Sequence, residues 1–277
     1  MSQAPSTPDS REASPGGPHR LALVTGASAG IGAAFAERLA RDAYDLVLVA
    51  RRRERLDELA ERLARTHGRR VDVLVADLTT SEGVRAVEAR IAAEPTLELL
   101  VNNAGFGTSG AFADLDCDGE EEEVRLNVLA LLRLTHAALA AMKARGHGSV
   151  INVSSLAGFQ PGPYNATYSA TKAFVNAFTQ AVSEELRGTG VRLQLLCPGF
   201  TRTEFQDVAG VRTEGIPDFA WMSAEAVVEA SLAGLRSGDL LVIPGGGNKV
   251  LGALLRSVPS AVARRVGGVV LRRTLGK

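Results

Sequence analysis

The sequence predicts an α/β fold: a single doubly wound domain in which helices cover both faces of a parallel sheet of about seven strands. Short apolar runs alternate with amphipathic segments of helical periodicity, and polar or glycine-rich residues follow directly after most runs. The runs are nearly continuous in Val, Leu and Ile, as is typical of strands buried on both faces. Right-handed β-α-β crossovers then make a doubly wound sheet the simplest topology. The runs span residues 21–24, 46–50, 71–75, 97–101, 149–153, 191–197 and 240–243.

Of the 277 residues, 45% are hydrophobic, which is enough for a sizeable core. Length and composition therefore fit one domain, which we expect over residues 20–248. Residues 1–19 are rich in Pro, Ser and Gly, so we expect a disordered leader and not a secretory signal. No stretch reads as long and apolar enough to span a bilayer. Cys117 and Cys197 lie far apart without metal-ligand spacing, which fits a reducing cytoplasm and predicts no disulfide and no metal site.

The formal net charge is zero, but the charges are unevenly distributed. Residues 249–277 hold seven of the 31 basic residues and none of the acidic ones, so the rest of the chain is acidic. This balance argues against nucleic acid as a partner of the main domain. In this tail Val262 and Val266 recur at helical spacing away from Arg264, a basic amphipathic pattern that fits contact with an anionic membrane. A helix packed on its own domain or on a partner subunit fits equally well.

A glycine-rich turn follows the first run: Thr25-Gly26-Ala27-Ser28-Ala29-Gly30-Ile31-Gly32, directly before the helical pattern 33–40. Glycines let a backbone turn tightly and approach a pyrophosphate, and the helix N-terminus behind them favours negative charge. The turn therefore predicts a dinucleotide site of the Rossmann type. Its candidate contacts are Gly26, Ser28, Gly30, Ile31 and Gly32.

The end of the second run indicates which dinucleotide is preferred. NAD sites usually carry an acid there, whereas this chain has Arg51 at the start of an arginine run. A guanidinium suits a 2′-phosphate, so we expect NADP(H), held by Arg51 first and by Ser28 as a second donor. The alternative is a solvated basic helix start. Asp77-Leu78 ends the third run, where the carboxylate either accepts from an adenine amino group or caps the next helix.

A phenol and an ammonium lie on one helix face at Tyr168 and Lys172, four residues apart. An unperturbed phenol is a poor acid-base catalyst at neutral pH, and a neighbouring cation favours its ionised form. Ser155, at the end of the fifth run, is placed to present a hydroxyl to the same substrate oxygen. Its neighbour Ser154 is the rival candidate, which we expect to face the packed side of the strand.

These motifs together resemble the short-chain dehydrogenase/reductase family over about residues 20–245. The matching residues are Thr25-Gly26-x-x-x-Gly30-x-Gly32, Asn102-Asn103-Ala104-Gly105, Asn127, Ser155, Tyr168-x-x-x-Lys172 and Pro198-Gly199. The resemblance implies an enzyme that transfers hydride between NADP(H) and a carbonyl or secondary alcohol. It also implies a homodimer or homotetramer.

The resemblance also assigns roles to individual residues. Tyr168 would be the general acid in reduction and the base in oxidation, while Lys172 would lower the pKa of Tyr168 and hold the nicotinamide ribose. Ser155 would orient the substrate oxygen, and Asn127 would keep a water in a proton relay. The remaining cofactor contacts implied are the backbone of Asn103, Ala104 and Gly105 along the adenosine, then Pro198, Gly199, Thr201 and Thr203 towards the nicotinamide.

The connection 199–222, which we call the lid, is unusually apolar, and the resemblance places a substrate-covering segment there. An apolar lid predicts a lipophilic carbonyl substrate, although its side chains equally suit simple packing onto the domain. The lid residues concerned are Phe200, Phe205, Val208, Val211, Ile216, Phe219, Trp221 and Met222. Further wall candidates are Phe106, Phe159 and Tyr164.

Two other interpretations of the sequence are disfavoured. Asp114-x-Asp116-x-Asp118-Gly119 imitates a calcium loop, but its twelfth position is Arg125 and not Glu, which argues against calcium. The run from Glu120 to Glu123 instead suits the positive end of a helix dipole. At the level of function, the rival hypothesis is a regulatory protein that binds NADP(H) without turnover; the intact set Ser155, Tyr168 and Lys172 argues against it.

Overall fold

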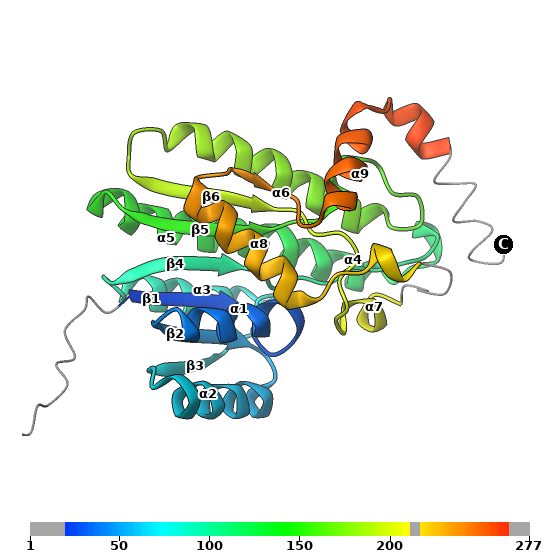
Figure 1. Cartoon of the computed structure of the whole chain (residues 1–277). Coiled ribbons are helices and arrows are strands. Elements are labelled where there is room, and N and C mark those ends of the chain that lie inside the picture. The colour runs from blue at the N-terminus through cyan, green and yellow to red at the C-terminus, as the bar shows by residue number, and fades with distance from the viewer. Residues whose placement is uncertain (1–19, 211–216, 266–277) are drawn as a thin grey trace, which may run out of the picture.

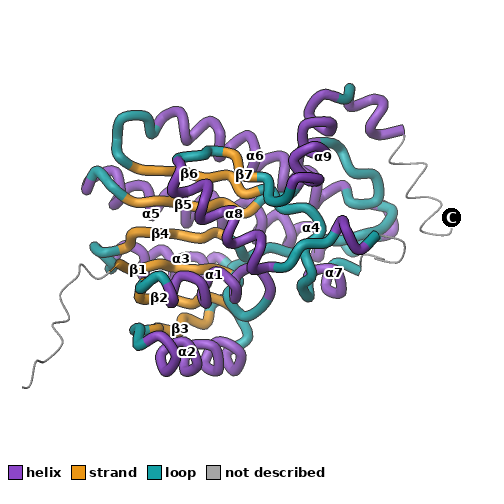
Figure 2. Tube along the Cα trace, viewed as in Figure 1, coloured by secondary structure: helices purple, strands orange, loops and turns teal. Residues whose placement is uncertain are grey.

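In the computed structural model, which describes residues 20–210 and 217–265, seven parallel strands form one sheet with helices on both sides (Figures 1 and 2). The strand order is β3-β2-β1-β4-β5-β6-β7, and every neighbouring pair is parallel. The predicted doubly wound α/β fold is confirmed. The strands are β1 (Arg20–Thr25), β2 (Tyr44–Ala50), β3 (Val71–Val75), β4 (Leu97–Asn102), β5 (Gly148–Val153), β6 (Val191–Leu196) and β7 (Leu241–Val242).

Helices connect the strands. The α-helices are α1 (Gly30–Arg41), α2 (Arg53–His67), α3 (Ser81–Ala92), α4 (Cys117–Val124), α5 (Leu131–Arg145), α6 (Ala166–Glu185), α7 (Phe205–Val208), α8 (Ala224–Ser237) and α9 (Gly246–Ser257). A π-helical turn, η2 (Arg125–Ala130), joins α4 to α5, and short 3₁₀ turns lie at η1 (Phe112–Asp114), η3 (Leu156–Phe159) and η4 (Asp218–Ala220).

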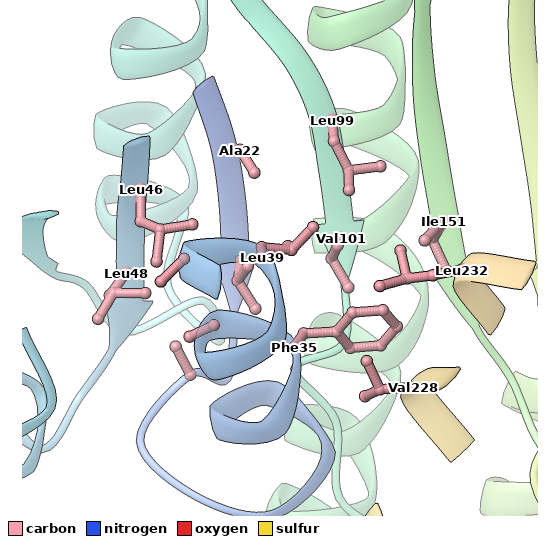
Figure 3. Packing of buried hydrophobic residues seen from close by; sticks show 14 of the residues in the cluster. Ala22, Phe35, Leu39, Leu46, Leu48, Leu99, Val101, Ile151, Val228 and Leu232 are labelled. Carbon is pink, nitrogen blue, oxygen red and sulfur yellow. The ribbon is translucent and has the colours of Figure 1, made fainter. Parts of the chain in front are cut away.

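Alternate residues of each strand point to opposite faces of the sheet, which divides the core into two main layers. On one face, Phe35 of α1 packs among residues of β1, β4 and α8, as Figure 3 shows. The labelled members of this layer are Ala22, Phe35, Leu39, Leu46, Leu48, Leu99, Val101, Ile151, Val228 and Leu232. On the other face α3 and α5 pack against Leu21 and Leu23 of β1. The sheet is therefore covered on both sides, as its apolar strands require.

The strand order reverses between β1 and β4, because β2 and β3 lie on one side of β1 and the later strands on the other. In doubly wound sheets a ligand crevice forms beyond the carboxyl ends of the strands at such a reversal. The glycine-rich turn after β1 and the segment after β4 meet at this place. The topology thus defines where a site is to be sought.

One helix corrects an expectation from the sequence. The continuous helix over Cys117–Arg145 is long and apolar enough, by length and composition, to cross a membrane. Its buried side includes Leu134 and Met142, which pack into the core layer that also holds β1. A core helix passes the same length and composition test, so this feature is weak evidence for a membrane span.

The C-terminal part of the described chain packs partly on the domain. In α9, Gly252 is buried, and Gln160 donates a hydrogen bond of 2.8 Å to the carbonyl of Val258 just after the helix. Val250 and Leu254 of α9 remain 72% and 57% exposed. The predicted leader 1–19, the lid residues Val211 and Ile216, and the tail from Val266 onward lie outside the described residues.

Candidate active site

The glycine-rich turn leaves no room for a side chain at its three glycines. Gly26 has φ of +66°, and a Cβ there would lie 2.8 Å from Nδ2 of Asn103. A Cβ on Gly30 would lie 2.9 Å from Cγ2 of Thr203, so the lid touches the turn. A Cβ on Gly32 would collide with the carbonyl oxygen of Gly26. The glycines are thus required by the close packing of turn, helix and lid.

Thr25 joins this turn to the segment after β4, a role that the sequence motifs did not single out. Its Oγ1 accepts hydrogen bonds from the backbone N–H groups of Asn103 and Ala104, both at 3.0 Å. The Asn103 side chain in turn donates to the carbonyl of Thr25 at 2.9 Å. Asn103, Ala104 and the adjoining Gly105 are therefore held along the same crevice as the turn. A Thr directly before the first glycine was the signal available in the sequence.

Arg52, the neighbour of the expected Arg51, reaches the turn. Its Nε and Nη2 donate to the Ser28 hydroxyl at 3.2 and 3.0 Å, and its Nη1 donates to Glu204 at 2.8 Å. The bonds from Arg52 and Arg55 keep the pKa of Glu204 below its ordinary value. Arg51 instead points towards Asp77, with 3.9 Å between Nη1 and Oδ2. Arg52 therefore reaches the turn, whereas Arg51 lies beside the segment that follows β3.

The segment after β3 shows whether the Asp77 side chain caps helix α3. Oδ1 of Asp77 accepts from the backbone N–H and the hydroxyl of Thr79 at 2.9 and 2.8 Å, whereas Thr80 caps α3 by accepting from Gly83. The interpretation of Asp77 as the helix cap is therefore wrong. Leu78 is buried beside it.

Ser155, Tyr168 and Lys172 come together from β5 and α6. The Ser155 side chain hydrogen-bonds Tyr168, and its Oγ also accepts from the N–H of Ala157 at 3.1 Å. Nζ of Lys172 lies 5.6 Å from the centre of the Tyr168 ring and donates to the carbonyl of Val153 at 3.0 Å. Ser154 is buried and donates to Asn176 at 2.6 Å, as its expected packed orientation requires.

The pKa values of this set depart from the expectation for Tyr168. Burial raises its pKa to about 12, with Ser155 opposing the rise and the Glu123 carboxylate adding to it. Burial lowers the pKa of Lys172 to about 8. Burial therefore outweighs the lowering by Ser155, and the pKa of Tyr168 lies above its ordinary value and not below it.

Asn127 lies in the π-helical turn η2, and π-turns occur often at functional sites. Its Nδ2 donates to the Phe106 carbonyl at 2.8 Å and to Thr171 Oγ1 at 3.1 Å, while its Oδ1 accepts from the Phe106 N–H at 3.2 Å. Asn127 thus fixes the segment after β4 against α6. Nζ of Lys172 and Oδ1 of Asn127 both lie against Gly105.

The first part of the lid continues from β6 over this site. Pro198 accepts from the N–H of Leu156 at 3.1 Å, and Gly199 lies against Asn248. Thr201 is buried and forms a bridge with Met222, which closes the lid at its base. Thr203 follows on the side of the glycine-rich turn. These lid positions border the crevice that the sequence motifs define.

Aromatic side chains of the lid differ in where they point. The ring of Phe205 lies 5.4 Å from that of Tyr168, whereas Phe200 stacks at a tilt on Trp221 with 5.5 Å between ring centres. Phe219 is 90% exposed.

The expected wall residues outside the lid also lie in different surroundings. Phe106 is bound through its backbone to Asn127, and Tyr164 accepts through its carbonyl from Gly110 at 2.9 Å. Phe159 packs instead beside α9, under the guanidinium of Arg256.

Two buried carboxyl groups next to the site were missed in the sequence. Glu120 and Glu123 are 6% and 0% exposed, whereas the acidic run 120–123 predicts only acids at the positive end of a helix dipole. Thr167 donates to Glu120, and Thr108 donates to Glu123 at 2.9 Å. A spacing of three residues within an acidic run was the sole hint of a shared buried face.

Comparisons with known proteins identify the family of this chain. A family model described as short chain dehydrogenase matches residues 20–212. Sulfoacetaldehyde reductase 2 of Chromohalobacter salexigens is 38% identical over 188 residues, which cover 67% of this chain and 74% of that protein.

Solved structures give similar results. A short-chain dehydrogenase from Sphingobium yanoikuyae in complex with NADPH has a TM-score of 0.79 and 38% identity, covering 87% of this chain and 96% of that chain. The bulky-bulky ketone specific alcohol dehydrogenase from Comamonas testosteroni has a TM-score of 0.75 and 35% identity. The match covers 88% of this chain and 97% of that chain.

Proposed function

The chain belongs to the short-chain dehydrogenase family and is an oxidoreductase that uses a nicotinamide cofactor, and on this premise we propose that it reduces a lipophilic carbonyl compound with NADPH. The reverse reaction would oxidise the corresponding secondary alcohol. The observation that carries the proposal is the meeting of Ser155, Tyr168 and Lys172 beside the glycine-rich turn.

The residues around the turn fit a dinucleotide with a 2′-phosphate. The N-cap of α1 is Ala29, whose methyl side chain accepts no hydrogen bond and leaves the first backbone N–H groups to an anion. Ser28 and Arg52 supply a hydroxyl and a guanidinium at the edge of the turn, and Arg51, the preceding residue, supplies a second guanidinium on the side of Asp77. Arginine favours a phosphate over the bare ribose hydroxyl, which supports NADP(H) over NAD(H). The NADPH-bound relative from Sphingobium yanoikuyae supports the same preference.

The proposed chemistry divides into hydride transfer and proton transfer. Bound NADPH supplies the hydride that a carbonyl carbon accepts. Tyr168 donates the proton to the carbonyl oxygen, and Ser155 holds that oxygen by a hydrogen bond. Lys172 provides a cation beside the phenol and donors for the ribose hydroxyls, and Asn127 keeps the segment after β4 in place beside it. The remaining proposed contacts to the cofactor are those of the sequence analysis, from Gly26 to Thr203.

The raised pKa of Tyr168 favours reduction as the direction. With a pKa of about 12, the phenol is protonated at neutral pH and is ready to donate. Oxidation requires the phenolate, which is scarce at that pH. The protonation state that reduction requires is therefore the one that this phenol holds at neutral pH.

The substrate class rests on the lid. Phe205 presents an apolar ring beside Tyr168, and Phe200, Trp221 and Met222 form the base of the lid. Such a wall suits an apolar or bulky carbonyl compound. The Comamonas testosteroni relative is named for its specificity for bulky-bulky ketones, which supports the same class here.

Three further expectations remain proposals. Homo-oligomers are common in the family, so we propose a homodimer or homotetramer in the cytoplasm. Val250, Leu251 and Leu254 leave α9 with an exposed apolar face next to a basic tail, which supports peripheral contact with an anionic membrane.

The test of the function is NADPH oxidation with a panel of ketones, aldehydes and acyl compounds graded by size. We expect turnover that is highest for lipophilic ketones, and a loss of at least about 100-fold in Tyr168→Phe with cofactor binding retained. Undiminished reduction by Tyr168→Phe would refute the mechanism. Firm NADPH binding without turnover on any substrate would favour the regulatory binding protein instead.

A further inference from the structure

Glu120 and Glu123 form a buried pair of carboxyl groups on the side of α4 that faces α6. Each has one oxygen bonded to a threonine, Thr167 and Thr108 respectively. Within the described part of the chain, the other oxygen of each, Oε1, has no hydrogen-bond partner. A buried carboxylate oxygen without a partner is costly, and such groups are rare in folded proteins. This pair therefore calls for a role beyond packing.

Glu123 lies one short segment away from the reacting groups. A Cβ on Gly105 would lie 3.5 Å from Nζ of Lys172, and a Cβ on Gly107 would lie 2.8 Å from Cδ2 of Tyr168. The next residue, Thr108, donates its hydroxyl to Oε2 of Glu123 at 2.9 Å. The backbone from 105 to 108 thus runs past Lys172 and Tyr168 and ends on Glu123.

The Glu123 carboxyl also interacts electrostatically with Tyr168 and Lys172. The groups that act on Glu123 are Glu120 from its own helix, Thr108 from the adjoining segment and Lys172 from α6. Burial raises the pKa of Glu123 to about 7. Its ionised form raises the pKa values of both Tyr168 and Lys172, and the Cys197 thiol after β6 acts on the same two groups.

We propose that Glu123 is a positioning residue whose negative charge, held behind Tyr168 and Lys172, keeps both groups protonated and so favours reduction over oxidation. The proposal rests on the proposed function of Tyr168. Glu123 itself touches no substrate and passes on no proton; it acts through the charge it places behind the pair. The charge is present above neutral pH and is removed when Glu123 takes up a proton.

The first test uses Glu123→Gln, which keeps the shape and a polar contact for Thr108 but removes the charge. We expect the alkaline loss of carbonyl reduction to move to lower pH by on the order of one unit. The acid limb of alcohol oxidation should move in the same direction, so oxidation between about pH 7 and that limb rises roughly tenfold. At pH well below 7 the two proteins should converge, because Glu123 is then protonated in the native enzyme.

A second test does not depend on turnover. The chain has four lysines, so labelled-lysine NMR can follow Lys172 alone once its signal is assigned with Lys172→Met. We expect half-protonation near pH 8 in the native protein and at a lower pH in Glu123→Gln. Glu123→Asp, which keeps the charge, should restore most of the native titration and pH profile. Glu122→Gln removes an equal charge from the exposed side of α4 and serves as the matched control.

The outcomes separate the two proposals. If Glu123→Gln leaves both the Lys172 titration and the pH limbs where they are, the role of Glu123 is refuted even though reduction proceeds. An equal shift in Glu122→Gln would also refute it, because the effect would then be one of overall charge. If Tyr168→Phe reduces carbonyls as well as the native enzyme, the proposed function fails, while the NMR titration still decides whether Glu123 controls Lys172.

Discussion

At the scale of single residues, Arg51 and Arg52 follow β2 directly, and their different contacts lead to a test of cofactor choice. Arg52 holds Ser28, whereas Arg51 lies towards Asp77. Both guanidinium groups are about half exposed or more and have donors to offer a phosphate.

Single exchanges to Asp should measure what each arginine contributes. We expect Arg51→Asp and Arg52→Asp each to lower the ratio of kcat/KM for NADPH over NADH by about 10- to 100-fold, because a charge-assisted bond is lost and a repulsive acid is added. Arg53→Asp, at the exposed start of α2, is the control of equal charge change. An unchanged ratio in both variants would refute the assignment of a 2′-phosphate site to this pair.

The sequence predicts the positions of some site residues and misses those of others. Ser155, Tyr168 and Lys172 lie together, as the sequence predicts, because a strand end and a helical spacing of four fix where their side chains project. The choice between Arg51 and Arg52 depends on how the chain leaves β2, which no local pattern encodes. The burial of Glu123 among four consecutive glutamates depends on the packing of α4 against α6, a tertiary contact.

At the scale of elements, the strands and helices follow from periodicity, whereas their special turns do not. β3 begins and ends where the apolar run does, and β7 is shorter than its run 240–243. The π-turn at Asn127 interrupts the α-helix without changing the helical pattern of the sequence. Sequence periodicity therefore predicts a regular α-helix there. Thr80 caps α3 in place of Asp77, because the Asp77 side chain is bound to Thr79.

In the proposed function the lid selects the substrate, and its Phe205 ring contacts Tyr168. Phe205→Ala should lower kcat/KM for bulky ketones about tenfold, because an apolar ring beside the phenol is lost, and should affect small aldehydes less. Phe219→Ala removes an exposed ring from the same lid and should leave both classes unchanged. Equal losses for large and small substrates in Phe205→Ala would indicate that the ring supports Tyr168 and does not select substrate.

At the scale of the whole molecule, the active-site charges oppose folding stability near neutral pH. The pKa of Glu123 is about 7 in the folded chain against an ordinary 4.5, so the native state binds the extra proton between these values. Its contribution to the free energy of unfolding therefore falls as pH rises through that range. The pKa of Lys172 is lowered from 10.5 to about 8, so its contribution rises with pH between these values. Both buried groups are charged between about pH 7 and 8, where together they stabilise the fold least.

This opposition predicts that an active-site variant is more stable than the native protein. Glu123→Gln should raise the free energy of unfolding at pH 8 by up to about 3 kcal/mol and change it little at pH 4.5, since the gain equals the native cost of ionising Glu123. Urea unfolding at both pH values measures the difference, with Glu122→Gln as the exposed control. A Glu123→Gln protein that is no more stable than the native chain at pH 8 would mean that Glu123 is ionised at little cost, and that its charge is compensated by groups other than Lys172 and Thr108.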